Sequence, residues 1–516
     1  MGAPQRALPP IGTYVPREAS GTVLYGVIVG TLETFLAHAR ARDRIVPSFV
    51  EGEFRAFLDC GIASNGFLRV HCDGCGFDRL VPFSCKGRGF CPSCGGRRMA
   101  EAAADLVDRV FPQVPVRQWV LSLPVALRYR MAFDAELTSE ILTAFIRVLF
   151  SSLRRRARVG RTIRYPQPGA VTFIQRFGDA LNLNVHFHVL ALDGVFDADD
   201  PAGITFIPLE SPTDTEIMGV ARAFVRRLSR LLDRRGLCGD GESEAADPLP
   251  IDDPLLAELC GASVTGRTAS GQRAGQRVRR LGDRVDTDIL PAAATPGCVQ
   301  FGGTNLHAAV AVPANDRRRL ERLCRYTSRP ALANDRLSRR EDGLLVYRLR
   351  HPWRDGTTAM LFEPMELMER LAVLVPPPWS HLVRYHGILA PNASCRHKVI
   401  PAPEQTAADR AACKARRYGH PLNPPADTPA AVGPPESPGT KGDAPAAGTG
   451  HSWATLLARV FSTDALSCPR CGHAMRIMAA IQSQEAIRAI LECLGLPCRP
   501  PPAAPPIRTA VLPFDE

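Results

Sequence analysis

The sequence predicts an α+β fold in which helices pack on an antiparallel sheet. Residues 116–123 form a strand-like apolar run, and residues 137–156 form a helix with a basic end. Two β-rich runs, 170–177 and 183–192, follow on either side of a short turn that contains Gly178. Two such runs around a glycine-containing turn are typical of a β-hairpin. A strand, a helix and a hairpin in this order favour the α+β class.

The chain of 516 residues is long enough for several domains. We predict six regions, which differ in cysteine, proline and glycine content. They are an N-terminal helical region (1–59), a cysteine-dense ribbon (60–98), the main α+β domain (99–398) with insertions at about 197–300, a Pro/Ala/Gly-rich linker (399–450), a small C-terminal module (451–498) and a Pro-rich tail (499–516).

The charge balance of the chain favours a polyanionic partner. The net charge is +11, and such a basic balance suits nucleic acid better than a membrane. Residues 1–18 lack the apolar segment of a signal peptide, and the run 23–29 is too short to span a bilayer. We therefore expect a reducing, cytoplasmic setting with no membrane partner, in which the 16 cysteines bind metal rather than form disulfides.

The segment 182–190 places two histidines on one strand face. Successive side chains of a strand point to opposite faces. Val185 and Phe187 therefore share an apolar face, whereas His186 and His188 share a polar face with Asn184. Two imidazoles on one face can hold a metal ion, and the rest of the chain decides what that ion does.

Two C-x2-C knuckles predict a structural zinc site in the ribbon. They are Cys72–Cys75 and Cys91–Cys94. Zn²⁺ prefers four soft ligands in a tetrahedron, and each knuckle presents two thiolates on a tight turn. We predict one ion shared by the two knuckles. Cys60 and Cys85 lie nearby, and we interpret both as core thiols rather than as part of a second site.

A third knuckle follows the linker. Cys468 and Cys471 have the same C-x2-C spacing and form a candidate second zinc site. Cys493, Cys498 and His473 are the available partners, although their spacing does not make a second knuckle.

One tyrosine lies among arginines on a predicted helix, residues 315–327. Residues three, four and seven apart share a helix face. Tyr326 therefore lies on a face with Arg319, Arg322 and Arg329, beside an apolar stripe. Guanidinium groups bind phosphate well, and nearby positive charge makes a phenol a better nucleophile. The alternative is a half-buried tyrosine that packs on a basic helix.

These motifs occur in an order that resembles a known family. The segments that carry the resemblance are residues 83–94, 175–177, 182–196, 324–330 and 385–387. Together they resemble the rolling-circle transposases of the insertion-sequence 91 type, which belong to the HUH endonuclease superfamily. The resemblance covers roughly residues 51–398 and, more loosely, the C-terminal module.

The resemblance implies a function and a role for each motif. His186 and His188 match the ligands of a divalent ion, Mg²⁺ or Mn²⁺, and Tyr326 matches the catalytic tyrosine. The main domain would be an HUH-type nuclease domain, and the ribbon would be the family's zinc-binding domain. The implied activity nicks and rejoins single-stranded or hairpin transposon ends and target DNA through a 5′-phosphotyrosine. Host replication proteins would then be partners, on nucleoid DNA in the bacterial cytoplasm.

The chain departs from the prototype members in its tyrosines. Prototypes carry two tyrosines four residues apart, whereas Arg322 and Pro330 flank Tyr326 at that spacing, as in a single-tyrosine branch. The third ligand of the divalent ion is Gln175 or Asn334, of which Gln175 on the neighbouring strand is preferred.

Two other functions are compatible with parts of the sequence, and a third is not. A replication initiator or relaxase would use the same chemistry on a different DNA. A non-catalytic zinc-ribbon DNA-binding protein would keep the cysteines without the cleavage. A nucleotide hydrolase with three alternating histidines is excluded because residue 190 is leucine.

Overall fold

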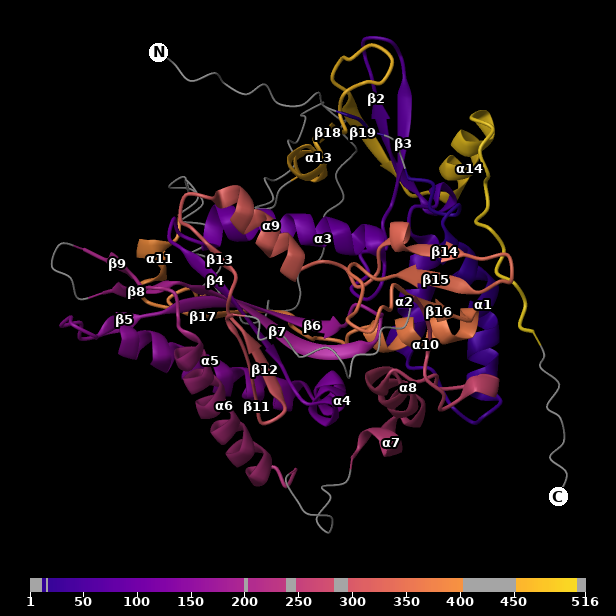
Figure 1. Cartoon of the computed structure of the whole chain (residues 1–516). Coiled ribbons are helices and arrows are strands. Elements are labelled where there is room, and N and C mark those ends of the chain that lie inside the picture. Colours follow the sequence, from indigo (N-terminus) through magenta and orange to yellow (C-terminus); the bar gives the residue numbers. More distant parts are fainter. Residues whose placement is uncertain are drawn as a thin grey trace, which may run out of the picture.

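The computed structural model describes residues 12–14, 17–198, 203–237, 247–282, 296–401 and 452–507 (Figure 1). Almost all of the predicted linker (399–450) and the end of the predicted tail lie outside these ranges. The described part is an α+β protein built on antiparallel sheets, which confirms the predicted fold class.

An antiparallel seven-stranded sheet forms the centre of the molecule. Its strand order is β11-β12-β4-β7-β6-β17, and the short strand β13 also pairs with β4. The strands are β4 (Val116–Ser122), β6 (Gly169–Phe177), β7 (Leu183–Leu192), β11 (Cys298–Phe301), β12 (Thr304–His307), β13 (Ala311–Val312) and β17 (Val383–Gly387). The predicted strand and hairpin are the three central strands of this sheet.

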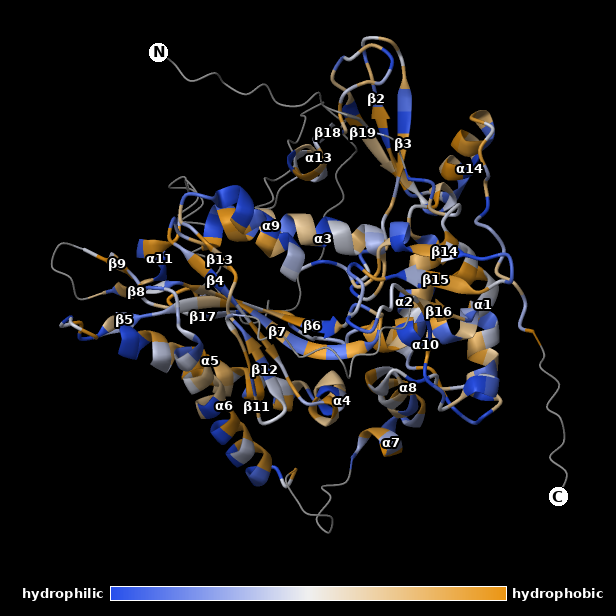
Figure 2. Cartoon of the chain, viewed as in Figure 1, coloured by the Kyte–Doolittle hydropathy of each residue, from blue (hydrophilic) through white to orange (hydrophobic). Residues whose placement is uncertain are grey.

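One face of the sheet packs on long helices. Val185 and Phe187 of β7 belong to the largest apolar core, together with buried residues of α5 and α6. In Figure 1 these helices lie below the sheet, and in Figure 2 the strands show long orange stretches. The helices of this core are α1 (Val23–Arg40), α2 (Ser48–Asp59), α4 (Val125–Phe133), α5 (Ala135–Ala157), α6 (Asp214–Arg234), α8 (Pro254–Thr265) and α10 (Pro364–Leu374).

The opposite face carries α3 (Pro92–Asp105), the π-helical turn η2 (Leu106–Val110) and α9 (Arg317–Thr327). The predicted stripe of α9 is confirmed, since its buried residues are Leu320, Leu323, Cys324 and Thr327. Arg317 joins α9 to η2, because its guanidinium donates to the carbonyl oxygens of Phe111 (2.8 Å) and Pro112 (3.0 Å). These carbonyls lie at a helix end, where backbone acceptors lack partners within the helix.

A close approach fixes the end of α9 against the start of α3. A Cβ placed on Gly95 would lie 2.7 Å from the Cβ of Pro330, so only glycine fits there. Pro330 follows the tyrosine helix, whereas Gly95 follows a cysteine knuckle in α3. The cysteine region and the tyrosine helix therefore pack directly on each other.

The remaining elements form smaller sheets and short helices around this centre. The four-stranded sheet has the order β10-β16-β15-β14, and a three-stranded sheet has the order β5-β8-β9. Their bounds are β5 (Pro166–Gln167), β8 (Gly194–Asp197), β9 (Thr205–Pro208), β10 (Arg279–Leu281), β14 (Leu337–Arg339), β15 (Leu345–Arg348) and β16 (Ala359–Phe362), with α7 (Leu249–Asp252), α11 (Arg396–Val399), η1 (Ala63–Asn65), η3 (Gly271–Arg273) and η5 (Asn334–Arg336). None of the helices in the described ranges is long and apolar enough to cross a membrane.

One further sheet joins a hairpin from the N-terminal part of the chain to a strand from its C-terminal part, which the predicted domains keep apart. Strands β2 (Phe67–His71) and β3 (Asp78–Pro82) form a hairpin, and β19 (Arg476–Ile481) pairs with β2. The ribbon and the C-terminal module, predicted as separate regions, therefore share one sheet. Two helices and a short strand complete this end of the molecule, namely α13 (Trp453–Phe461), α14 (Gln484–Cys493) and β18 (Thr463–Asp464), which pairs with β1 (Gly12–Thr13).

Candidate functional site

The two predicted histidines lie side by side on β7, under α9. Their Nε2 atoms are 3.1 Å apart, and both rings are buried, with 8% of His186 and 3% of His188 exposed. Both face away from the large core, as the alternation of the strand predicts. Two imidazole nitrogens at this separation can serve as ligands of one ion.

The outer ring nitrogens are held by fixed partners. His186 Nδ1 is 2.8 Å from the carbonyl oxygen of Asn184, to which it donates, so its Nε2 carries a lone pair in the neutral ring. His188 Nδ1 is 2.8 Å from the side-chain amide of Gln118 on β4. Such partners orient the imidazoles of metal sites and select their tautomers.

Burial keeps both histidines neutral. The pKa of His186 is lowered to about 4, mainly by loss of solvation; the Asn184 hydrogen bond raises it, and the positive charges of Arg329 and Arg128 lower it. Burial also lowers the pKa of His188 well below its usual value, with His186 and Arg329 adding to the effect. Neutral imidazole is the form that binds metal ions.

Gln175, the predicted third metal ligand, lies beside the histidine pair. It lies opposite His186 in the β6–β7 register, and its Nε2 donates to the carbonyl oxygen of Thr327 on α9 (2.8 Å). Its Oε1 is buried and has no hydrogen-bond partner among the described residues. Asn334 has a similarly unpartnered Oδ1, but it lies in η5, beyond the tyrosine helix. Two imidazoles and an amide oxygen fit a divalent ion such as Mn²⁺ or Mg²⁺.

The structure brings Tyr326 to the histidine pair. The ring of Tyr326 meets the ring of His188 edge to face, with centroids 5.9 Å apart, and 45% of the tyrosine is exposed. The guanidinium of Arg329 lies over the tyrosine ring, 4.3 Å from its centroid, and donates to the Tyr326 carbonyl oxygen. A solvent-accessible phenol therefore lies between buried imidazoles and a cation.

The other predicted arginines lie farther along α9. Arg319 and Arg322 are exposed on the helix turns that precede Tyr326. They extend the basic surface away from the histidines. Arg350 adds a cation that the sequence did not single out. Burial lowers its pKa, as does Arg329, whereas the nearby Tyr326 raises it.

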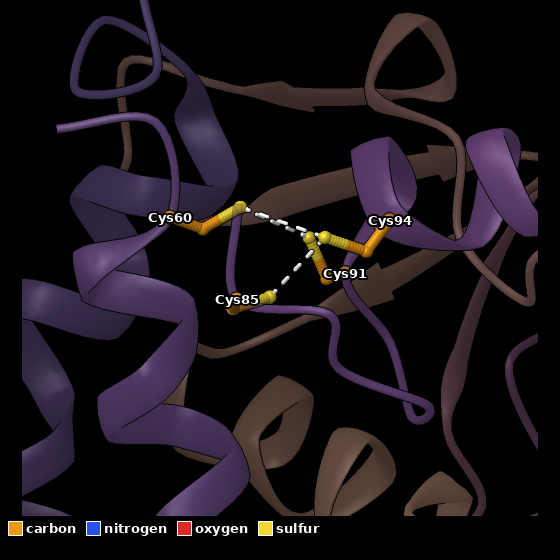
Figure 3. Close-up of side chains that lie close together, drawn as sticks. All are labelled: Cys60, Cys85, Cys91 and Cys94. Atoms are coloured by element: carbon orange, nitrogen blue, oxygen red, sulfur yellow. Dashed lines mark hydrogen bonds between the residues drawn. The ribbon is translucent and has the colours of Figure 1, made fainter. Parts of the chain in front are cut away.

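The predicted grouping of the ribbon cysteines is wrong. Cys91 and Cys94 do not meet Cys72 and Cys75; they gather instead with Cys60 and Cys85, the two residues interpreted as core thiols (Figure 3). We call Cys60, Cys85, Cys91 and Cys94 the core cluster. Its Sγ atoms lie within 4.8 Å of one another, and the Cys60–Cys94 and Cys85–Cys94 separations are 3.7 and 3.4 Å.

The first knuckle joins the C-terminal knuckle instead. Cys72, Cys75, Cys468 and Cys471 form a second group within the same 4.8 Å limit, which we call the split cluster. None of the suggested partners of Cys468 belongs to this group. Cys493 is exposed on α14, and the thiol of Cys498 is near backbone carbonyls. His473 accepts a hydrogen bond from the Cys468 N–H through its carbonyl oxygen, and its ring lies against Gly74.

Both clusters fit zinc. A tetrahedron with Zn–S bonds of about 2.3 Å has S–S edges of about 3.8 Å. The Sγ separations of 3.4–3.8 Å in the core cluster and 3.5 Å in the split cluster are close to that edge, and they are far longer than a disulfide bond of about 2.05 Å. Four thiols at such distances match the ligand set of a structural zinc site.

Some site residues escaped the sequence analysis for identifiable reasons. Gln118 and its neighbour Arg117 are two adjacent polar residues in a mostly apolar, buried strand, and such residues are a usable signal because buried polar groups need partners. Arg128 and Arg350 carry no such signal, because their proximity to the site depends on how α4 and the loop after β15 fold back.

Comparison with protein families agrees with this geometry. Residues 169–398 match the family model Y2_Tnp, described as "Putative transposase", and residues 31–123 match Zn_Tnp_IS91, described as "Transposase zinc-binding domain". No curated protein and no solved structure matches the chain.

The two matches define the class as a transposase with a zinc-binding domain, and they follow each other in the order that the motifs predict. The chain belongs to the insertion-sequence 91 family of transposases. It is thus a DNA-cleaving enzyme whose partner is DNA and whose cysteine clusters support structural Zn²⁺.

Proposed function

We propose that this transposase nicks and rejoins single-stranded element ends through a covalent 5′-phosphotyrosine on Tyr326. The observation that carries the proposal is the contact between Tyr326 and His188. It places an accessible phenol against two buried, neutral imidazoles that lie within reach of one divalent ion.

In this proposal, His186, His188 and the orphan Oε1 of Gln175 hold Mg²⁺ or Mn²⁺. That ion would supply Lewis-acid chemistry by drawing charge off the scissile phosphate. For His188 Nε2 to act as a ligand, its Nδ1 must keep the proton and donate to the oxygen of Gln118. A half-turn of the Gln118 amide provides that acceptor, so Gln118 sets the tautomer of His188.

The phenol oxygen of Tyr326 then attacks the scissile phosphorus. The bond from phosphorus to the 3′ oxygen breaks, the phenol proton leaves to solvent, and the released 3′ oxygen takes up a proton. Arg329 and Arg350 place positive charge where the phenolate develops. Arg319 and Arg322 extend along the exposed side of α9, where they would hold the phosphates of the bound strand.

A single tyrosine must act more than once. Attack of a 3′ hydroxyl on the phosphotyrosine joins the strand and returns the phenol to Tyr326, which is then ready for the next transfer. The first 3′ hydroxyl would prime synthesis by host replication proteins, as in rolling-circle transposition. The reaction would take place on nucleoid DNA in the bacterial cytoplasm.

Adduct formation tests the nucleophile. The protein is incubated with labelled single-stranded DNA from an element end and Mn²⁺, and a covalent adduct is expected on a denaturing gel. Tyr326→Phe should reduce the adduct by at least about a hundredfold, because no other group supplies the phenol oxygen. Tyr165→Phe is the matched control, since Tyr165 is exposed and also has an arginine over its ring. An adduct that persists in Tyr326→Phe would remove Tyr326 from this role.

Metal binding tests the histidines separately from catalysis. Mn²⁺ binding, followed by its paramagnetic resonance signal, should be lost in His186→Ala/His188→Ala together with cleavage, while DNA binding stays. His386→Gln replaces a partly buried histidine of the same sheet and should change neither. Normal cleavage by the double variant would refute the metal assignment. DNA binding without cleavage in the wild-type protein would favour a non-catalytic DNA-binding function.

A further inference from the structure

We propose that the split cluster binds one zinc ion that clasps the C-terminal segment to the N-terminal hairpin, and that this clasp holds α13 against the tyrosine helix. The family match to the zinc-binding domain ends at residue 123, so it does not include Cys468 and Cys471. The proposal concerns metal and chain geometry, and it stands whether or not Tyr326 is the nucleophile.

The four thiols come from two matching turns. Cys72 and Cys75 lie at the tip of the β2–β3 hairpin, and Cys468 and Cys471 lie in the turn that precedes β19. The Cys72–Cys471 and Cys75–Cys468 Sγ separations are both 3.5 Å, close to the edge of a zinc–sulfur tetrahedron. Each knuckle therefore contributes two ligands to one site, as in a zinc ribbon built from separate parts of the chain.

Apolar packing alone is a weak attachment for this segment. Among the described residues, the buried cluster around the site consists of Val70, Cys72, Cys468 and Met475, and α14 adds a second small cluster in which Ile487 and Leu491 pack on Phe67. Strand β19 is exposed along nearly its whole length. A sheet with so small a buried face is marginal in water. A structural zinc ion contributes its binding free energy directly to folding, which would hold the segment in place.

The clasped segment continues into a contact with the tyrosine helix. The buried guanidinium of Arg79 in β3 donates to the carbonyl oxygen of Ala465, between α13 and the split cluster (2.8 Å). Leu456 of α13 packs on Ala100 and Ala104 of α3. The segment before the cluster is thus fixed on the helix that begins at the core cluster.

Arg459 of α13 then bridges two elements of the site face. It bonds Asp108 of η2 at 3.0 Å and Glu321 of α9 at 2.9 Å. Glu321 lies five residues before Tyr326, on the same helix. Zinc in the split cluster would therefore hold Arg459 where it steadies α9 beneath the tyrosine, and loss of that zinc would release the contact.

Metal content and chain association test the clasp together. A protease recognition sequence is inserted between residues 401 and 452, and the full-length protein is cleaved there. Native mass spectrometry should find two zinc ions per wild-type chain, and the two fragments should elute together until a chelator is added. Cys468→Ser/Cys471→Ser and Cys72→Ser/Cys75→Ser should each retain one zinc and release the C-terminal fragment.

The controls make each result decisive. Cys493→Ser/Cys498→Ser should keep two zinc ions and keep the fragments together. The one zinc retained in the split-cluster variants shows that the rest of the chain has folded. Two zinc ions in Cys468→Ser/Cys471→Ser, or equal fragment association with and without zinc in the split cluster, would overturn the clasp.

Hydrogen exchange tests the second half of the proposal. Amides of α9 should exchange several-fold faster in Cys468→Ser/Cys471→Ser and in Arg459→Ala than in wild type, whereas Cys493→Ser/Cys498→Ser should match wild type. Unchanged exchange in α9 after zinc loss would show that the clasp does not steady the tyrosine helix.

Discussion

The core cluster and the split cluster each consist of four cysteine thiols, but they join segments that are separated by very different lengths of chain. Cys60 and Cys94 of the core cluster are 34 residues apart, whereas Cys72 and Cys471 of the split cluster are 399 residues apart. The core cluster is mostly buried beside Phe90, but Cys75 and Cys471 of the split cluster are exposed. One site closes a local fold, and the other joins two distant segments.

The difference shows what a C-x2-C motif can and cannot predict. Each knuckle reliably places two thiols on one turn, but it does not select the other two ligands. Strands β2 and β3 are five residues long, about 17 Å, and they carry the Cys72 knuckle to the hairpin tip. Cys60 and Cys85 stay at the hairpin base, next to α3. Hairpin length therefore decides which thiols share an ion.

Breaking the core cluster should have the largest effect. In Cys91→Ser/Cys94→Ser, loss of the zinc should cost on the order of 10 kcal/mol, comparable with the whole stability of a domain. The cluster packs in the same core as α1, α2 and the central sheet, so we expect loss of cooperative thermal unfolding. Circular dichroism with heating measures this. The matched split-cluster variant Cys468→Ser/Cys471→Ser should keep a cooperative transition, and equal losses in both would contradict the comparison.

The predictable part of the molecule is the part that depends on local periodicity. The His186–His188 face and the buried stripe of α9 follow from strand and helix repeats that extend over a few residues. By contrast, the contact of Gln118 with His188 depends on strand order. Hairpin length decides whether Cys60 or Cys72 joins Cys91 and Cys94. Strand order and hairpin length are set by pairing between segments far apart in the sequence, which no local pattern records.

A histidine variant should separate two effects of acid, namely zinc loss and loss of core stability. Thiolates take up protons when zinc leaves, so an acid titration mixes both processes. His386 of β17 isolates the core contribution. Burial, with a smaller effect of Arg384, lowers its pKa to about 4, and its Nε2 lies 2.9 Å from Thr172 Oγ1. Because the pKa in the unfolded chain is about 6.5, the stability from this histidine is present above that pH. It is lost as the pH falls toward 4.

His386→Gln removes this titration and leaves both clusters intact. Between pH 7 and pH 4.5, the wild type should lose about 2 kcal/mol more free energy of unfolding than the variant. Urea unfolding of both proteins at each pH measures the difference. Zinc release contributes equally to both proteins and therefore cancels. Parallel stability curves for the two proteins would contradict a depressed pKa at His386.

The smallest expected effect is at Arg459, where the split cluster meets the tyrosine helix. Arg459→Ala removes the bonds to Asp108 and Glu321 and should cost about 1 kcal/mol, because these ion pairs are only partly buried. Arg476→Ala is the control, since its pair with Asp73 is mostly exposed and should contribute almost nothing. Both variants should keep two zinc ions, which distinguishes loss of the contact from loss of the metal. If Arg459→Ala matched Arg476→Ala in stability and in α9 exchange, the split cluster would attach the C-terminal segment without supporting the tyrosine helix.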